Sequence, residues 1–165
     1  MTEFHNPGSI GLSKGNLVWT VPNWGYEIDI EFDIMVDSGI SLEWSNVFLM
    51  TALDYASSKL GGRLPNFHVW NGGKKFEIVF SVNGNNNYPT YVPYQWNQWY
   101  HFQISQLIIP TGEAQYRIKI NCNTVHEILN NQPKNFPEAK LYLSSPKILN
   151  LSMGYDPPKF KYDKL

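Results

Sequence analysis

Three carboxylic acids alternate with apolar residues near the start of the chain: Glu27, Asp29 and Glu31. Alternate residues of a β-strand point to one face of the sheet, so their carboxyl groups are expected to form a row. Residues 27 and 31 lie about 13 Å apart along an extended strand. Twist and long side chains could bring the outer carboxyls toward the ~5–5.5 Å separation of a retaining glycosidase pair. The row therefore has the residue types for acid–base chemistry on a sugar.

The same row also fits an ordinary solvated strand face. Ile28, Ile30, Phe32 and Ile34 alternate with the acids, and the acidic series continues to Asp33. An antiparallel sheet with one buried face shows this alternation without any catalytic role. We interpret the row as surface and keep the catalytic reading as the alternative.

A second candidate segment, residues 85–96, interleaves amides with aromatic rings. Aromatic faces stack on sugar C–H surfaces, and Asn side chains offer hydroxyl groups both donors and acceptors. Trp70 beside Asn71-Gly72 adds an aromatic residue near a turn. A packed crossover with edge-strand prolines is the competing interpretation. The predicted ligand-binding residues are Trp70, Asn83, Asn85, Asn87, Tyr88 and Tyr91.

Other chemistry has little support in the residue types. The single cysteine, Cys122, is expected to be a small buried residue, because no activating neighbour is evident. The four histidines are too scattered for a zinc site. No metal site or cofactor is predicted. Calcium stays open, with Asp37 and Asp54 as candidate ligands, although the cation of Arg63 occupies a loop where an acid would be useful.

The elements that must position these residues are almost all strands. Period-2 alternation and turn signals predict about ten of them, with one short helical candidate over residues 51–59. An aromatic content of 15% also favours strands. The chain is therefore expected to be all-β, a sandwich of two antiparallel sheets. The expected strands are residues 17–21, 26–34, 46–51, 66–70, 76–82, 99–105, 115–120, 125–129, 140–143 and 148–152.

The length of 165 residues suits one domain, which we place at residues 1–156, with residues 157–165 as an extended tail or linker. A net charge of −1 gives no reason to expect nucleic acid as a partner. No apolar run approaches the 18 or more residues of a membrane span, so membrane insertion is not predicted.

Several motifs between residues 44 and 143 resemble laminin-G-like domains of the concanavalin A-like superfamily. They are Gly61-Gly62-Arg63-Leu64-Pro65, Val82-Asn83-Gly84-Asn85, the Trp-rich segment 95–102, and the hairpin of residues 116–126. This resemblance implies a jelly-roll fold. It also implies an extracellular module that binds glycans or proteins and, in some members, calcium.

The stretch Glu27-Ile28-Asp29-Ile30-Glu31 resembles the signature of laminarinase- and lichenase-type glycoside hydrolases. Carried over, the resemblance makes Glu27 the nucleophile, Glu31 the general acid/base and Asp29 the residue that tunes them. In those enzymes the motif lies near mid-chain and the chain is longer, whereas only 26 residues precede Glu27.

We therefore predict a non-catalytic extracellular recognition or adhesion module that binds a glycan or an extracellular protein through loops and the Asn/aromatic segment. A β-glucan hydrolase using Glu27 and Glu31 is the first alternative. A structural matrix domain that pairs through an exposed sheet edge is the second. The sequon Asn150-Leu151-Ser152 agrees with secretion, and the oligomeric state stays open.

Overall fold

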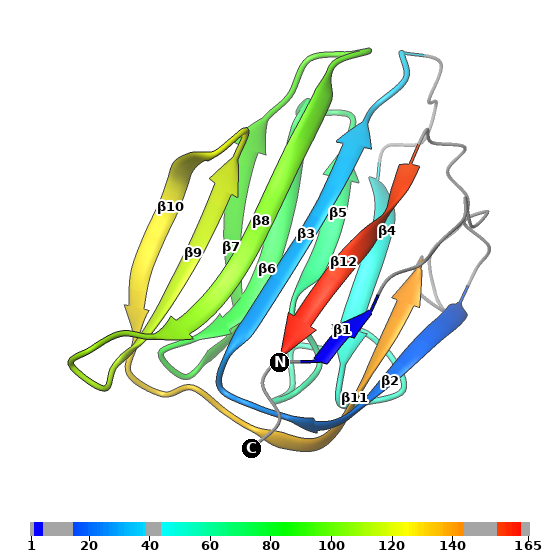
Figure 1. Ribbon diagram of the computed structural model, residues 1–165. Helices are drawn as coiled ribbons and strands as arrows, with labels where there is room; N and C mark the ends of the chain where they lie inside the picture. The colour runs from blue at the N-terminus through cyan, green and yellow to red at the C-terminus, as the bar shows by residue number, and fades with distance from the viewer. Residues whose placement is uncertain (1, 5–14, 39–43, 144–154, 163–165) are drawn as a thin grey trace.

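The computed structural model describes residues 2–4, 15–38, 44–143 and 155–162, and these residues form twelve β-strands (Figure 1). Among them, no helix is long and apolar enough to span a membrane. The strands are β1 (Thr2–Phe4), β2 (Asn16–Trp24), β3 (Ile28–Met35), β4 (Trp44–Thr51), β5 (Asn66–Trp70), β6 (Lys75–Val82), β7 (Asn85–Pro93), β8 (Trp99–Ile108), β9 (Ala114–Ile120), β10 (Asn123–Asn130), β11 (Phe136–Leu143) and β12 (Tyr155–Tyr162).

The strands build two six-stranded antiparallel sheets that face each other as layers (Figure 1). Sheet A has the order β1-β12-β3-β8-β9-β10, and sheet B has the order β2-β11-β4-β5-β6-β7. Neighbouring strands within a sheet are often far apart in sequence; β11, for example, lies between β2 and β4. The predicted all-β sandwich of two antiparallel sheets is confirmed.

The core between the sheets is aromatic. Phe32 of β3 and Phe102 of β8 are stacked with centroids 5.3 Å apart. Phe48 of β4 and Phe67 of β5 meet the edge of Phe32 from sheet B at 5.2 and 5.0 Å. Edge-to-face and stacked pairs of this kind contribute beyond their buried area. The alternation that predicts β3 therefore has its physical cause in this core, because Ile28, Ile30, Phe32 and Ile34 all point into it.

Several segments differ from the prediction. The expected helix over residues 51–59 is absent: Thr51 ends β4 and an irregular loop follows. The helix-like periodicity of this segment spans too few residues to define a helix. Residues 85–93, expected to belong to a turn or crossover, form β7. The expected boundary at residue 156 falls inside β12, which pairs with β3, so residues 157–162 belong to sheet A rather than to a tail. The expected strand 148–152 and its sequon lie outside the described residues.

Cys122 also differs from expectation, because it is exposed rather than buried. It lies with Asn121 in the turn between β9 and β10, where both residues have positive φ angles of 66° and 50°. A two-residue hairpin turn with two left-handed residues turns its side chains away from the sheets. The usual burial of free cysteine is overridden here by the tightness of the turn.

Candidate functional site

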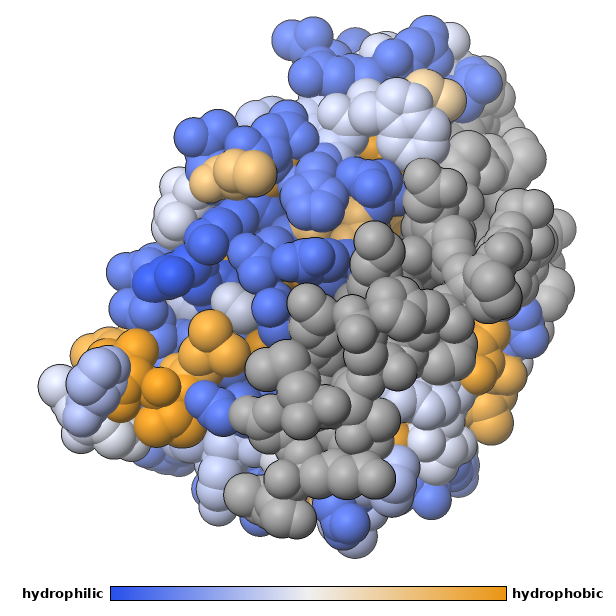
Figure 2. Space-filling view, viewed as in Figure 1, coloured by the Kyte–Doolittle hydropathy of each residue, from blue (hydrophilic) through white to orange (hydrophobic). Residues whose placement is uncertain are grey.

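The acidic row of β3 lies on the outer face of sheet A. Its neighbours on β8 hold two of the carboxylates: Gln103 Nε2 donates to both oxygens of Asp29 at 3.0 and 3.1 Å, and His101 Nδ1 lies 2.9 Å from Asp33 Oδ1. Figure 2 shows this face of the molecule, and its described surface is largely hydrophilic. These acids take part in cross-strand pairs on a polar sheet surface.

Glu27 and Glu31 do not share the environment of one catalytic pair. Glu27 precedes β3, and its Oε1 accepts a hydrogen bond of 2.8 Å from the backbone N–H of Ile108. Glu31 lies within β3, between the register positions of Gln103 and Lys159. Glu27 therefore anchors the end of β8 by accepting a backbone hydrogen bond.

The outer face of sheet B has a different composition. Register brings two rows of side chains together across β4, β5, β6 and β7: Trp44, Trp70 and Lys75 lie in one row, while His68, Glu77 and Tyr91 lie in the next. We call these six residues the aromatic face. Large rings, a cation, an acid and a phenol therefore share one patch, assembled from four strands.

Stacking organises the first row. The indoles of Trp44 and Trp70 are nearly parallel, with centroids 5.1 Å apart and an interplanar angle of 8°. The ammonium of Lys75 lies 5.8 Å from the Trp70 ring centroid and 6.0 Å from that of Tyr91. Both distances permit cation–π attraction. Gly73 supports the arrangement, since a Cβ there would lie only 2.7 Å from the Trp70 ring.

Two of the rings of the aromatic face are exposed to solvent. Trp44 is 39% exposed and Tyr91 is 49% exposed, whereas Trp70, Lys75 and Glu77 are half-buried. The Tyr91 hydroxyl donates to Glu77 Oε1 at 3.0 Å. Desolvation, together with that hydrogen bond and the charge of Glu77, raises the pKa of Tyr91. Tyr91 is consequently a neutral phenol whose hydroxyl donates to the side chain of Glu77.

His68 forms the floor of the aromatic face. It is buried, and the edge-to-face ring of Trp44 lies 6.1 Å away. Burial, with a smaller contribution from the positive charge of Arg63, lowers the pKa of His68 to about 4. Its Nδ1 and the Nε1 of Trp70 are buried atoms that have no hydrogen-bond partner among the described residues. The floor thus contains a neutral imidazole with unused hydrogen-bonding capacity.

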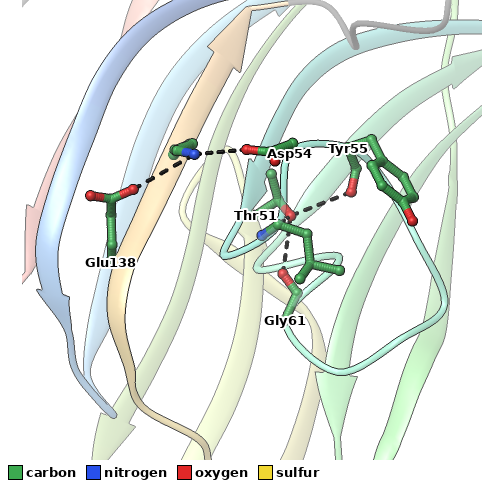
Figure 3. Close-up of polar contacts among 7 residues, drawn as sticks. Thr51, Asp54, Tyr55, Gly61 and Glu138 are labelled. Atoms are coloured by element: carbon green, nitrogen blue, oxygen red, sulfur yellow. Dashed lines mark hydrogen bonds and ion pairs between the residues drawn. The ribbon is translucent and has the colours of Figure 1, made fainter.

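The loop of residues 52–65 connects β4 to β5 at one end of sheet B. Asp54 of this loop accepts a hydrogen bond from Lys140 of β11 at 2.8 Å, and Glu138 lies 3.7 Å from the same ammonium (Figure 3). Thr51 Oγ1 donates to the Gly61 carbonyl at 3.1 Å. Asp54, a candidate calcium ligand, is therefore engaged in an ion pair. No group of three potential metal-binding side chains occurs in the described part of the chain.

The predicted ligand-binding residues separate into two groups. Trp70 and Tyr91 lie on the aromatic face, on either side of Lys75. Tyr88, three residues before Tyr91, packs against the core and lies 5.7 Å from the His126 ring. Because strand side chains alternate, an odd spacing places Tyr88 and Tyr91 on opposite faces.

The three asparagines lie at the β6–β7 turn. Asn83 Nδ2 donates to the Leu129 carbonyl at 2.9 Å, and the Asn83 N–H donates to Asn130 Oδ1 at 2.9 Å. Asn85 Oδ1 accepts from the Asn87 N–H at 2.9 Å. At least Asn83 and Asn85 thus hold the turn. Asn85 and Asn87 are exposed and lie at even spacing from Tyr91, so they share its outer side of β7, at the turn end of the strand and outside the six residues of the aromatic face.

Sequence reasoning missed Trp44, Lys75, Glu77 and His68 as members of a site. Trp44 precedes the strand expected at residue 46, and Lys75 precedes the strand expected at residue 76. Their proximity depends on the register of four strands, which single-strand periodicity does not contain. The one available signal was local: Trp70 and Lys75 flank a short turn, so a hairpin there would pair them.

A separate hollow of about 430 Å³ lies where β2 ends and β11 begins. Its lining consists of Asn23, Trp24, Asn135, Phe136 and Pro137, and none of these side chains titrates. It offers no acid or base of its own. The aromatic face is therefore the stronger candidate for function.

Comparison with solved structures identifies the architecture. A mutant of the alginate lyase Aly36B in complex with alginate trisaccharide aligns with a TM-score of 0.55 at 14% identity, covering 94% of this chain and 81% of that one. A heptameric SAP-like pentraxin from Limulus polyphemus aligns with a TM-score of 0.52 at 10% identity, covering 96% and 72%. This chain has the same two-sheet jelly-roll fold.

An endo-β-1,4-glucuronan lyase from Trichoderma reesei has the same jelly-roll architecture, with a TM-score of 0.50, 9% identity and coverage of 91% and 75%. No protein-family model matches the sequence, and no curated protein matches it either. Identities this low establish the jelly-roll fold alone, so function must be argued from the aromatic face itself.

Proposed function

We propose that this jelly roll is a non-catalytic module that binds glycans through the aromatic face of sheet B. The observation that carries the proposal is the stacked Trp44–Trp70 pair, with the Trp44 ring exposed, beside Lys75, Glu77 and Tyr91. Aromatic rings pack on the C–H surface of a pyranose, while the charged and phenolic groups hydrogen-bond its hydroxyls. A few convergent polar groups set among apolar surface are typical of a small-ligand site.

The comparisons support this proposal at the level of fold. The alginate lyase mutant is a saccharide complex, and its jelly roll aligns with 94% of this chain. We extend saccharide recognition to this chain because the aromatic face supplies the chemistry. Laminin-G-like membership, an extracellular location and a role in adhesion to glycans or proteins form part of the same proposal, in line with the motifs at residues 61–65 and 82–85.

The absence of catalysis is supported by the engaged carboxylates of sheet A. Asp29 and Asp33 are paired with Gln103 and His101, and Glu27 accepts the Ile108 N–H. We expect no reducing ends and no unsaturated uronate to be released from laminarin, lichenan or alginate. Reducing-sugar and ultraviolet assays measure both products, and turnover of any of these substrates would contradict the non-catalytic assignment.

Substitution of the exposed rings tests the binding face. Trp44→Ala and Tyr91→Ala each remove a stacking surface without opening the core, so each should weaken oligosaccharide binding about five- to tenfold. An oligosaccharide array selects the ligand, and titration calorimetry measures the change in Kd.

The matched control is Trp99→Ala. Trp99 is 49% exposed but lies on the outer face of sheet A, opposite Met35 in the register. Its substitution should leave the Kd unchanged. Unchanged binding in both Trp44→Ala and Tyr91→Ala, or a loss confined to Trp99→Ala, would remove the assignment to sheet B.

A further inference from the structure

We infer that the glycan held by the aromatic face carries acid groups, carboxylate or sulfate, and that Lys75 recognises them. This inference rests on the proposed function and adds the chemical class of the ligand. Lys75 is a half-buried cation between Trp70 and Tyr91, in the middle of the patch where sugar rings would stack.

The position of Lys75 fits an exocyclic acid group. Its Nζ lies within 6.0 Å of the centroids of both Trp70 and Tyr91. A pyranose stacked on the exposed Tyr91 ring would therefore place a substituent at its rim within reach of the ammonium. The three donors of a lysine ammonium match the acceptor oxygens of a carboxylate or sulfate.

The charge balance of this region favours an anion. Among the described residues, neither Lys75 nor its neighbour Lys74 forms an ion pair; each lies near an aromatic ring, Lys74 Nζ being 5.9 Å from the Trp96 centroid. Glu77, the acid of the aromatic face, accepts the hydroxyl of Tyr91. Arg63 adds a further positive charge beside His68.

Sheet A provides the contrast. Its outer face carries lysine and arginine as well, but Arg117 Nε lies 2.5 Å from Glu127, and the acids Asp29, Glu31 and Asp33 surround the same strands. Anionic ligands would meet carboxylates there. Of the two outer faces, the aromatic face alone joins stacking rings to a cation without a carboxylate ion-pair partner in the described part of the chain.

The experiment compares three oligosaccharides of equal length: an oligomannuronate, the same oligomer with its carboxyls reduced to alcohols, and a sulfated oligosaccharide. Titration calorimetry gives each Kd at low ionic strength and again with added salt. Wild-type protein should bind one of the acidic oligomers roughly tenfold more tightly than the reduced oligomer, and salt should diminish that preference. The more tightly bound acidic oligomer identifies the acid group.

Lys75→Gln keeps a polar side chain and removes the charge, so it should abolish most of the preference by weakening the acidic oligomers far more than the reduced oligomer. Lys119→Gln is the matched control, because Lys119 is a half-buried lysine on the outer face of sheet A opposite Gln103. It should preserve the preference. Far-ultraviolet circular dichroism of both variants checks the fold.

Two results would overturn the inference: equal or tighter binding of the reduced oligomer by wild-type protein, or a preference for acid that survives in Lys75→Gln. If the reduced oligomer binds best and Trp44→Ala weakens it, the proposed glycan-binding function stands and only the acidic specificity falls. If none of the three oligomers binds and the oligosaccharide array finds no ligand, the proposed function itself fails.

Discussion

At the residue scale, His68 shows how burial changes an ordinary side chain. It lies under the ring edge of Trp44, and burial, followed by the charge of Arg63, lowers its pKa to about 4. The unfolded chain, where this group has its usual pKa of 6.5, binds a proton more readily. Protonation of His68 at acidic pH therefore favours the unfolded state.

The sign of this linkage gives a prediction for stability. The lower folded pKa has no effect above about pH 6.5, and the free energy of unfolding should fall as the pH drops from there toward 4. The full loss due to His68 is of the order of 3 kcal/mol. Urea titrations of wild type and His68→Gln across this range measure it, and the variant should lose stability less steeply. Parallel pH profiles would contradict a buried neutral imidazole.

Single residues also show where sequence reasoning succeeds and where it stops. Trp70 and Tyr91 could be selected because an aromatic ring beside turn residues is a local signal. Tyr88 was selected by the same signal, yet its ring contacts the core, because a segment interpreted as a loop is the strand β7. The amide-rich composition suggested a ligand surface, whereas Asn83 satisfies backbone groups of its own turn and of β10.

At the scale of elements, β10 ends on a polar anchor. Asn130 is buried, and its Nδ2 donates to Gln106 Oε1 of β8 at 2.6 Å and to the Ser81 carbonyl of β6 at 3.2 Å. Its Oδ1 accepts the Asn83 N–H. One side chain thus joins strands of both sheets at the same end of the sandwich.

Asn130→Ala should therefore destabilise the protein by about 1–3 kcal/mol, because several buried partners lose their hydrogen bonds at once. The exposed neighbour Asn131 offers the control, since its contribution to the turn is a backbone N–H that donates to Asn83 Oδ1 at 2.6 Å. Asn131→Ala should change stability little. Thermal unfolding of the two variants compares them, and equal midpoints would show that the anchor contributes nothing.

Strand periodicity predicted β3, β6 and β8 closely because each alternates around a buried row. It missed β12, where a proline pair and charged residues suggested a tail. β12 nevertheless pairs with β3, with a register irregularity between Asp156 and Lys159. β12 is a strand because it pairs with β3, and pairing between strands far apart in sequence leaves no local pattern in the sequence.

At the scale of the whole molecule, one aromatic core links the two sheets. Phe67 of sheet B is fully buried and lies 5.0 Å from both Phe32 and Phe102 of sheet A. Phe67→Ala should cost about 3–5 kcal/mol through lost contacts and the cavity left behind. Because both sheets share the core, near- and far-ultraviolet signals should lose structure in one coincident transition.

Leu107→Ala is the control for that prediction, since Leu107 is 40% exposed on β8 and should shift the transition little. Two separate transitions, or a Phe67→Ala cost no larger than that of Leu107→Ala, would contradict a single shared core. Because the core residues hold the two sheets together, the outward-facing residues of each sheet can differ in chemistry without changing the fold.

The stacked indoles of Trp44 and Trp70 also give the protein an optical reporter. Two stacked indoles with centroids 5.1 Å apart couple their electronic transitions, and the circular dichroism of the pair depends on how the rings are rotated relative to one another. Replacing either Trp44 or Trp70 would abolish the coupling, so its contribution can be assigned among the six tryptophans. A ligand that stacks on the exposed Trp44 ring would change this coupling. Binding at this face can thus be followed by spectroscopy on unlabelled protein.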